Sequence, residues 1–266
     1  MTPADADPTP FGRRSFLAAA VLAVGALATA CGDDGGSTGA ATTATSAPAT
    51  SAAPTPAPST APPEAQFVVS GPKDHDRVAL TFHTNGDLGL VDQLLDVFAS
   101  KKVHVTAFIV GNWLEANPDM ARRIADGGHE FANHTYTHPT FGALSPAGML
   151  DEIVRCRDVL TRLTGGPGKF FRPSGTDDGT TSPGQQVLDI AAQAGYATVL
   201  GFDVDPLDYD DPGADAVKQR TLATVAAGSI VSLHFGHSGT VDAMPAILDG
   251  IAQKGLKAGT ASALLG

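Results

Sequence analysis

Two histidines that lie four residues apart are the side chains in this sequence best suited to hold a metal ion. His134 and His138 belong to the string NHTYTHP, which follows a short run, residues 129–133, that is expected to form a strand. At the end of a strand each imidazole can turn one ring nitrogen toward a common ion, and two histidines with a carboxylate and an open water position make a catalytic Zn²⁺ site. Taken alone, the pair is also compatible with two exposed loop histidines.

Other reactive side chains follow the remaining expected strands. In folds built from alternating strands and helices, the carboxyl ends of parallel strands meet at one face, and the active sites of βα barrels lie there. We therefore expect these side chains to converge with the histidine pair. They are His83, Asn85 and Asp87 after the first strand, Arg172, Asp177 and Asp178 after the fourth, Asp203, Asp205 and Asp208 after the fifth, and His234 and His237 after the sixth.

The elements that position these residues alternate regularly from residue 77 onward. Short β-branched runs alternate with amphipathic stretches, which predicts an α/β fold of parallel strands joined by helices. A single distorted (β/α) barrel of about seven parallel strands is the simplest arrangement, with a doubly wound open sheet as the main competitor. The clearest helix begins after Ser145, an expected N-cap, and ends near Gly165. The expected strands span residues 77–82, 103–110, 129–133, 169–172, 196–204, 229–234 and 256–261.

The first 66 residues predict an export signal followed by a tether. Residues 1–31 contain paired arginines and an apolar run that ends at Cys31, which resembles a twin-arginine lipoprotein signal peptide. As a helix the apolar run would span roughly 22 Å, less than the roughly 30 Å of a bilayer core. Residues 32–66 are almost wholly Ala, Thr, Ser, Pro and Gly, which predicts a disordered tether. Residues 67–266 are then the folded domain.

The two cysteines are expected to have different fates. We predict that Cys31 carries a lipid, which would hold the protein at the outer face of the cytoplasmic membrane. Ordinary signal cleavage near the same place would instead release a secreted protein. Cys156 lies within the apolar stripe of the helix that follows Ser145, so we expect a small buried core residue and no disulfide.

The charge of the folded part argues against nucleic acid as a partner. The formal net charge is -11 for the chain and -8 for residues 67–266, where 15 basic residues stand against 23 acidic ones. A surface of this sign repels phosphate backbones and anionic lipids at long range. We therefore expect a neutral or cationic substrate, and contact with a membrane only through the lipid at Cys31.

The order of the motifs over about residues 75–266 resembles the polysaccharide deacetylases of the NodB homology domain, carbohydrate esterase family four. The string GHE at 128–130 leading to HTYTH at 134–138 is very similar to the family's metal-binding His-Ser/Thr-x-x-His motif. That likeness implies that His134 and His138 are metal ligands. It also implies a NodB-like distorted barrel.

Three later motifs resemble the same family. The string FRP around Arg172 is similar to its Arg-x-Pro motif, DPLDY at 205–209 resembles Asp-x-x-Asp-Trp, and SLH at 232–234 resembles its Leu-x-His region. The resemblance implies that His234 is the general acid and that Asp208 orients it. Arg172 would either contact substrate or brace two loops through a carboxylate pair.

The first motif departs from the family pattern. Where the family has Thr-Phe-Asp-Asp-Gly, residues 81–87 read TFHTNGD, so His83 stands at the place of the catalytic base and Thr84 at that of the metal-binding aspartate. Asp87 is the nearest carboxylate that a curled loop could bring to the ion. His83 could alternatively be a third nitrogen ligand, which would leave the base role to Asp87 or Asp177.

These residues suggest a hydrolytic mechanism. A divalent ion, with Zn²⁺ the first choice, held by His134, His138 and Asp87 would acidify its water and polarise an acetamide carbonyl. His83, kept neutral by the ion and by Arg172, would act as general base.

We therefore predict a metal-dependent hydrolase that removes N- or O-acetyl groups from a cell-envelope polysaccharide such as peptidoglycan or chitin-like oligomers. Trp113, Tyr136 and Tyr209 are candidates to stack on its sugar rings. The missing carboxylate pair of the first motif motivates the alternative, a catalytically inactive carbohydrate-binding lipoprotein. A solute-binding lipoprotein is a weaker third reading, because about 200 residues leave little room for two lobes.

Overall fold

The computed structural model of the chain describes residues 64–176 and 178–266. The signal peptide, Cys31, most of the tether and Asp177 lie outside the described residues. Ala65 is already buried and the first strand begins at Gln66, so the folded part starts slightly before the expected boundary at residue 67. No helix in the described part of the chain has both the length and the apolar character needed to cross a membrane.

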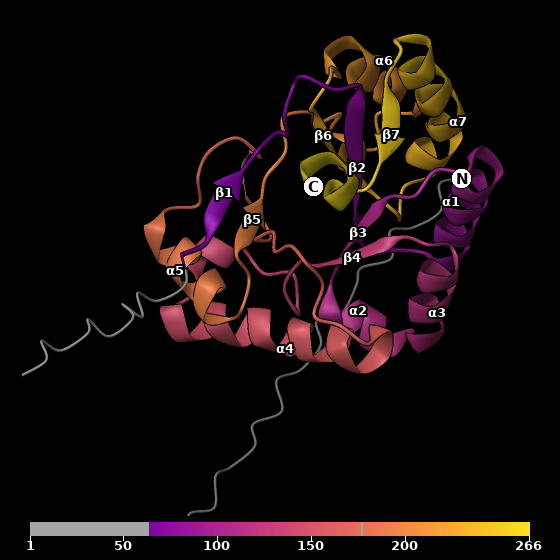
Figure 1. Cartoon of the computed structure of the whole chain (residues 1–266). Helices are drawn as coiled ribbons and strands as arrows, with labels where there is room; N and C mark the ends of the chain where they lie inside the picture. Colours follow the sequence, from indigo (N-terminus) through magenta and orange to yellow (C-terminus); the bar gives the residue numbers. More distant parts are fainter. Residues whose placement is uncertain (1–63, 177) are drawn as a thin grey trace, which may run out of the picture. The chain divides into compact units, whose positions relative to one another are not determined.

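Parallel strands form the centre of the domain (Figure 1). A five-stranded sheet has the order β4-β3-β2-β6, with β7 also paired to β2, and β1 pairs with β5. Seven of the eight residues of β2 are buried, as expected for a β-branched and apolar run, RVALTFHT, that pairs with three other strands. The strands are β1 Gln66–Val68, β2 Arg77–Thr84, β3 Thr106–Ile109, β4 Glu130–Asn133, β5 Thr198–Leu200, β6 Ile230–His234 and β7 Lys257–Gly259.

Single bridged residues connect the two sheets. Phe171 pairs with Asn133 at the end of β4 and with Val199 in β5, and Val204 pairs with Val231 in β6. The expected strand over residues 169–172 is therefore reduced to one paired residue, because Gly168 with φ 78° turns the chain before it and Pro173, which lacks an N–H donor, ends it. The α/β class with parallel strands is confirmed.

Helices surround these strands (Figure 1). The helix expected after Ser145 is α4, whose first turn is capped by the Ser145 hydroxyl, which accepts a hydrogen bond from the Gly148 N–H. It ends at Gly165, whose φ of 83° favours glycine. The described helices are α1 Leu88–Lys101, α2 Gly111–Ala116, α3 Pro118–Asp126, α4 Pro146–Thr164, α5 Gln185–Gln193, α6 Ala214–Thr224, α7 Ser238–Gln253 and α8 Ala261–Leu265, with short 3₁₀ turns η1 Phe141–Ala143 and η2 Asp208–Asp210.

The core lies between the strands and their covering helices. Phe82 of β2 packs its ring against Phe98 of α1 and against Phe235 after β6, with ring centroids 5.2 Å apart in both contacts. Cys156 is a free, fully buried thiol in α4, as expected from the apolar stripe, and it donates to the carbonyl of Ile109. Packing of the strands against the covering helices fixes where each strand ends. It therefore also fixes the positions of the residues that follow the strands.

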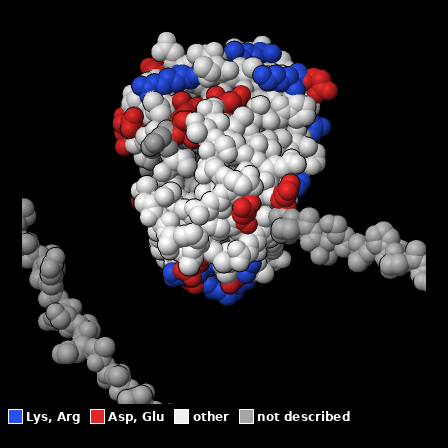
Figure 2. Space-filling view, turned by 90° about the vertical axis from the view of Figure 1, so that its left-hand side faces the viewer, with Lys and Arg blue, Asp and Glu red and all other residues white. Residues whose placement is uncertain are grey.

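The face shown in Figure 2 has most of its Lys and Arg side chains near its upper and lower ends. The wide area between them carries a few acidic side chains, and basic side chains appear there only at the right-hand edge. This distribution offers no continuous basic stripe for a phosphate backbone on that face, as the net charge of the domain predicts.

Candidate active site

The carboxyl ends of the strands line a pocket of about 350 Å³. Residues predicted from sequence meet there from four parts of the chain. β2 and β6 are paired so that His83 and His234 are partners in register, which puts both side chains on the same side of the sheet. Among the lining residues are His83, His134, His138, Asp205, Tyr209 and His234.

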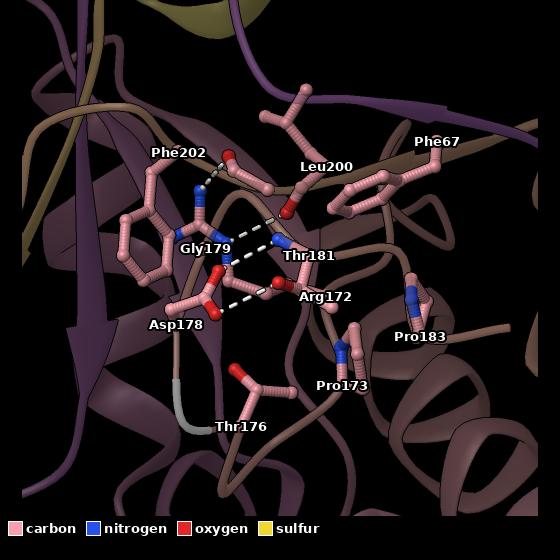
Figure 3. Close-up of a pocket in the computed structure, with 11 residues that line it drawn as sticks. Phe67, Arg172, Pro173, Thr176, Asp178, Gly179, Thr181, Pro183, Leu200 and Phe202 are labelled. Carbon is pink, nitrogen blue, oxygen red and sulfur yellow. Dashed lines mark hydrogen bonds between the residues drawn. The ribbon is translucent and has the colours of Figure 1, made fainter.

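Arg172 is the buried cation beneath this pocket. Its Nε donates to the Leu200 carbonyl at 2.8 Å and its Nη2 to the Gly201 carbonyl at 3.0 Å (Figure 3). Its Nη1 lies 3.0 Å from both the Thr81 hydroxyl and Nε2 of His83. Burial lowers the pKa of this guanidinium to about 9. Arg172 is thus braced by neutral acceptors, so the expected bracing through a carboxylate pair is not what the structure shows.

A second cavity, lined in part by Arg172, is too small to hold a sugar. Its volume is about 20 Å³, and it is lined by residues such as Phe67, Leu200 and Phe202 (Figure 3). A space of this size admits about one water molecule. Asp178 lies beside it and accepts hydrogen bonds from the Thr181 N–H and hydroxyl, which makes it a cap for its own loop.

The partners of His83 determine its tautomer. Arginine only donates, so Nε2 of His83 must accept from Arg172, and the proton of the neutral ring must reside on Nδ1. Nδ1 lies 2.9 Å from Nε2 of His234 and donates to it. Burial, with the nearby histidines and Arg172 as further causes, holds the pKa of His83 well below its usual value, so the neutral ring is the stable form.

His234 is oriented by Asp208, as the resemblance implied. Nδ1 of His234 lies 2.8 Å from one Asp208 oxygen, and the His234 backbone N–H donates to the other oxygen at 2.8 Å. The hydroxyl of Thr240, in the first turn of α7, donates to that second oxygen at 2.7 Å. Asp208 is buried, so this carboxylate is held by three donors in a water-poor setting.

His134 presents a free lone pair to the pocket. Its Nδ1 donates to the Arg172 carbonyl at 2.9 Å, which leaves Nε2 as an acceptor. Nε2 is buried and has no hydrogen-bond partner among the described residues. The His138 ring lies with its centroid 4.9 Å from that of His134. A buried acceptor without a partner is costly, so this nitrogen is suited to receive a ligand.

A carboxylate that the sequence reading missed holds the segment between the two histidines. Glu152 of α4 accepts from the backbone N–H groups of Tyr136 and Thr137 at 2.8 Å each, and from the Thr137 hydroxyl at 2.7 Å. Glu152 is buried. It lies three residues after Met149 and four before Cys156, on the apolar stripe of the helix, and a lone acid in such a stripe is a signal that could have found it.

The same segment has unusual backbone angles at both ends. Thr135 has φ 68° and His138 has φ 59°, a region that side chains other than glycine rarely adopt. Asn133 supports the first of these positions, because its side-chain oxygen accepts from the Thr135 N–H at 2.9 Å. These contacts fix the two imidazoles relative to each other.

The described residues fit a divalent ion only in part. His134 and His138 offer two nitrogen donors, but no group of three His, Cys, Asp or Glu able to hold an ion occurs in residues 64–176 and 178–266. Both nitrogens of His83 are already hydrogen-bonded, and its ring stacks on that of His134 at 4.0 Å with the planes 16° apart. Lone pairs in two nearly parallel planes do not converge on one ion, so His83 is not a third ligand in this arrangement.

Asp87, the expected third ligand, lies elsewhere. It is exposed and does not line the pocket. Its carboxylate caps the first turn of α1 by accepting from the Leu90 N–H at 3.1 Å. The expectation failed because an aspartate directly before a helix can accept from a free N–H of the first turn without curling back toward the strand end. Thr84 is buried and bonded to the backbone of Phe108 and Val110.

The three aromatic candidates differ in position. Tyr209 lines the pocket, is 45% exposed and lies with its ring 5.4 Å from that of His234, so it can present a face to a sugar. Tyr136 instead donates to Glu115, with the guanidinium of Arg155 over its ring. Trp113 donates its indole N–H to the Gly86 carbonyl. Neither of the last two lines the pocket.

Comparison with known proteins identifies the class to which this fold and site belong. The sequence model of the polysaccharide deacetylase family matches residues 70–199. A peptidoglycan-N-acetylglucosamine deacetylase of Bacillus cereus is 30% identical over 200 residues, which are 72% of this chain and 69% of that protein. The chain belongs to the polysaccharide deacetylase family.

Two solved structures from that family are similar to this chain. One is a peptidoglycan N-acetylglucosamine deacetylase, 30% identical with a TM-score of 0.68, and the match covers 75% of this chain and 92% of that one. The other is a mutant of a Bacillus anthracis pseudoenzyme of carbohydrate esterase family four with restored enzymatic activity. It is 26% identical with a TM-score of 0.70, and the match covers 76% of this chain and 71% of that one.

Proposed function

We propose that this protein removes acetyl groups from an N-acetylated glycan of the cell envelope, with peptidoglycan as the first candidate. The observation that carries the proposal is that His234, bonded to the buried Asp208, lines the same pocket at the strand ends as His134 and His138. The solved peptidoglycan N-acetylglucosamine deacetylase and the Bacillus cereus protein support this substrate class.

The residues of the pocket divide the work. Asp208 keeps the Nδ1 proton of His234 in place, so that Nε2 is the atom that takes up a proton and passes it to the departing amine. Tyr209 offers an exposed ring for a sugar face.

A divalent ion, Zn²⁺ in the first instance, belongs to this proposal. Held by His134 and His138, it would polarise the acetyl carbonyl and acidify a water molecule. The Glu152 carboxylate keeps the two imidazoles at a fixed separation for that purpose. Because the described donors number two, we expect an ion bound more weakly than by a full set of three protein ligands.

Acetate release from N-acetylglucosamine oligomers and from purified peptidoglycan tests the proposal, with and without added Zn²⁺. We expect the chain to release acetate and the His234→Ala variant to lose most of that activity. His104→Ala is the matched control, because His104 is exposed and does not line the pocket. Loss of activity in neither variant, or in both, would count against the role of the pocket.

Glycan binding without hydrolysis is the second candidate. It is favoured by the first motif, in which His83 and Thr84 replace two aspartates of the family pattern, and by the pseudoenzyme among the solved relatives. Calorimetric binding of N-acetylglucosamine oligomers that never release acetate, with or without Zn²⁺, would select this candidate. His134→Ala should then weaken binding without any change in acetate.

We also propose that the protein works outside the cytoplasm, anchored by a lipid at Cys31. The twin-arginine-type signal at residues 1–31 and the Ala, Thr, Ser and Pro-rich segment at 32–66 support this location. Labelled palmitate should be incorporated by the chain and not by Cys31→Ser. Retention of the unlabelled variant in the membrane fraction would contradict the anchor.

A further inference from the structure

One chain of hydrogen bonds runs from Arg172 through two histidines to Asp208. Arg172 donates to Nε2 of His83, Nδ1 of His83 donates to Nε2 of His234, and Nδ1 of His234 donates to Asp208. The direction of every bond follows from its ends, because a guanidinium only donates and a carboxylate only accepts. No other placement of the protons satisfies these three hydrogen bonds while both imidazole rings stay neutral.

This row of hydrogen bonds, the relay, uses all four ring nitrogens of His83 and His234. Those of His83 are taken by Arg172 and His234, and those of His234 by His83 and Asp208. Nε2 of His234 therefore has neither a proton for a leaving amine nor a free lone pair for a water molecule. The atom that a hydrolase of this design needs is occupied by a neighbouring side chain.

His83 is held too firmly to leave its position easily. It is 7% exposed, stacks on the His134 ring at a centroid distance of 4.0 Å and meets the Phe108 ring edge-on at 6.3 Å. The third contact is the Arg172 guanidinium, which is itself fixed by the carbonyls of Leu200 and Gly201. Opening the bond to His234 requires His83 or His234 to shift within this packed set.

We infer that His83 restrains the His234–Asp208 pair: it is a positioning residue that covers Nε2 of His234, and it is not the general base. This inference rests on the proposed function for its effect on turnover, but the hydrogen bond itself does not. Reaction in the pocket then begins with the opening of the His83–His234 bond. The histidine of the first motif slows the hydrolase that its neighbours would otherwise form.

Two substitutions at this position separate the restraint from other roles of the side chain. His83→Leu removes both nitrogens and keeps an apolar side chain of similar volume, so Nε2 of His234 becomes free. His83→Asn keeps an N–H donor at the place of Nδ1, so the bond to His234 can persist while the contact with Arg172 is lost. Thermal unfolding of both variants checks that each is folded before any comparison.

Acylation of His234 by diethyl pyrocarbonate reports the free lone pair directly. His237 is the internal reference, since its Nδ1 is bonded to Asp211 and its ring lines the same pocket. Relative to His237, we expect His234 to react about fivefold faster in His83→Leu than in the wild type, the factor expected for one lost hydrogen bond. His83→Asn should react at the wild-type rate. An unchanged rate in His83→Leu would overturn the inference.

Acetate release adds the second readout. The restraint predicts that His83→Leu releases acetate about as much faster as its His234 is acylated, and that His83→Asn does not. A general base at His83 predicts the opposite, a loss of 100-fold or so in both variants. If no variant releases acetate but His234 acylation follows the expected pattern, the proposed function fails and the restraint stands.

Discussion

The two carboxylate oxygens of Glu152 accept hydrogen bonds from the backbone N–H and the hydroxyl of Thr137, at 2.8 Å and 2.7 Å. Thr137 directly precedes His138, so a side chain from α4 fixes the position of the backbone from which His138 extends. The positive φ angles of Thr135 and His138 persist because such contacts over-determine the segment.

Replacing Glu152 with glutamine should therefore damage both stability and the pocket. A glutamine oxygen can still accept from the two backbone N–H groups while its amide turns to the Thr137 hydroxyl, but these bonds lose the strength that an ionised acceptor gives. We therefore expect a loss of about 1–3 kcal/mol in the free energy of unfolding. Affinity for N-acetylglucosamine oligomers should fall as well. Denaturant unfolding and calorimetry measure the two effects.

Asp151→Asn is the matched control for this substitution. Asp151 is the neighbouring acid on α4, is exposed, and pairs with Arg155 at 3.6 Å on the surface. Such pairs contribute about 0–1 kcal/mol, so the control should stay close to wild type. Equal losses in both variants would show that the position on the helix matters and the buried contacts do not.

Asp87→Ala should lower stability without affecting chemistry. Its carboxylate caps α1 through the Leu90 N–H, and loss of such a cap costs about 0.5–2 kcal/mol. Asp87→Ser restores a capping oxygen and should restore the free energy of unfolding. If Asp87→Ser is stable yet releases less acetate than the wild type, the carboxylate acts beyond its cap.

Asp208→Asn should reduce acetate release by about 100-fold or more, the range associated with general acid–base catalysis. The amide can present an N–H to His234 where an acceptor is needed, so the His234 ring loses its fixed tautomer. Rates with oligomers of N-acetylglucosamine measure the effect. Asp210→Asn, an exposed position in the same 3₁₀ turn, should retain wild-type rates.

Stability should fall as the pH drops below about 6.5, in part because of a histidine far from the pocket. Burial, assisted by His104 and Arg123, lowers the pKa of His129 to about 4. The unfolded chain then takes up a proton near pH 6.5 while the folded chain does not, so the contribution of His129 is complete above pH 6.5 and is lost as the pH falls toward 4.

His129→Asn tests this contribution. The shift corresponds to at most about 3 kcal/mol, and asparagine keeps an oxygen to accept the Val105 N–H that now bonds Nδ1 of His129. The free energy of unfolding of the variant should depend less steeply on pH than that of the wild type. Identical slopes would assign the acid sensitivity to other groups, with His83 and His134, whose pKa values are also lowered, as the next candidates.

The sequence predicted the elements that carry the site better than the contacts between its side chains. The strand ends, the helix after Ser145 and the His134–His138 motif could be read because periodicity, capping residues and a fixed spacing are local signals. The pairing of His234 with Asp208 could be read only through the family resemblance. The position of Asp87 was misjudged because two local uses of one carboxylate, a cap and a ligand, compete, and sequence alone does not weigh them.

The relay and the Glu152 contact depend on relationships that no local pattern contains. His83 and His234 are 151 residues apart and meet because β2 and β6 are in register. Every ring nitrogen of the two histidines has a hydrogen-bond partner because Arg172 is buried next to His83, and the burial of Arg172 depends on the whole fold. Such nonlocal contacts are decided by packing, which the periodicity of one segment does not specify.

The pairing of β1 with β5 has a mechanical consequence. β1 has three residues, is the first strand of the folded part and runs parallel to a strand more than 130 positions later in the chain. Tension applied through the residues before Glu64 would reach this short contact before it reached β2, β3 or β6. If the protein is anchored at Cys31 as proposed, a pull from the membrane would therefore peel away β1 first and leave the histidines and their carboxylate partner in place.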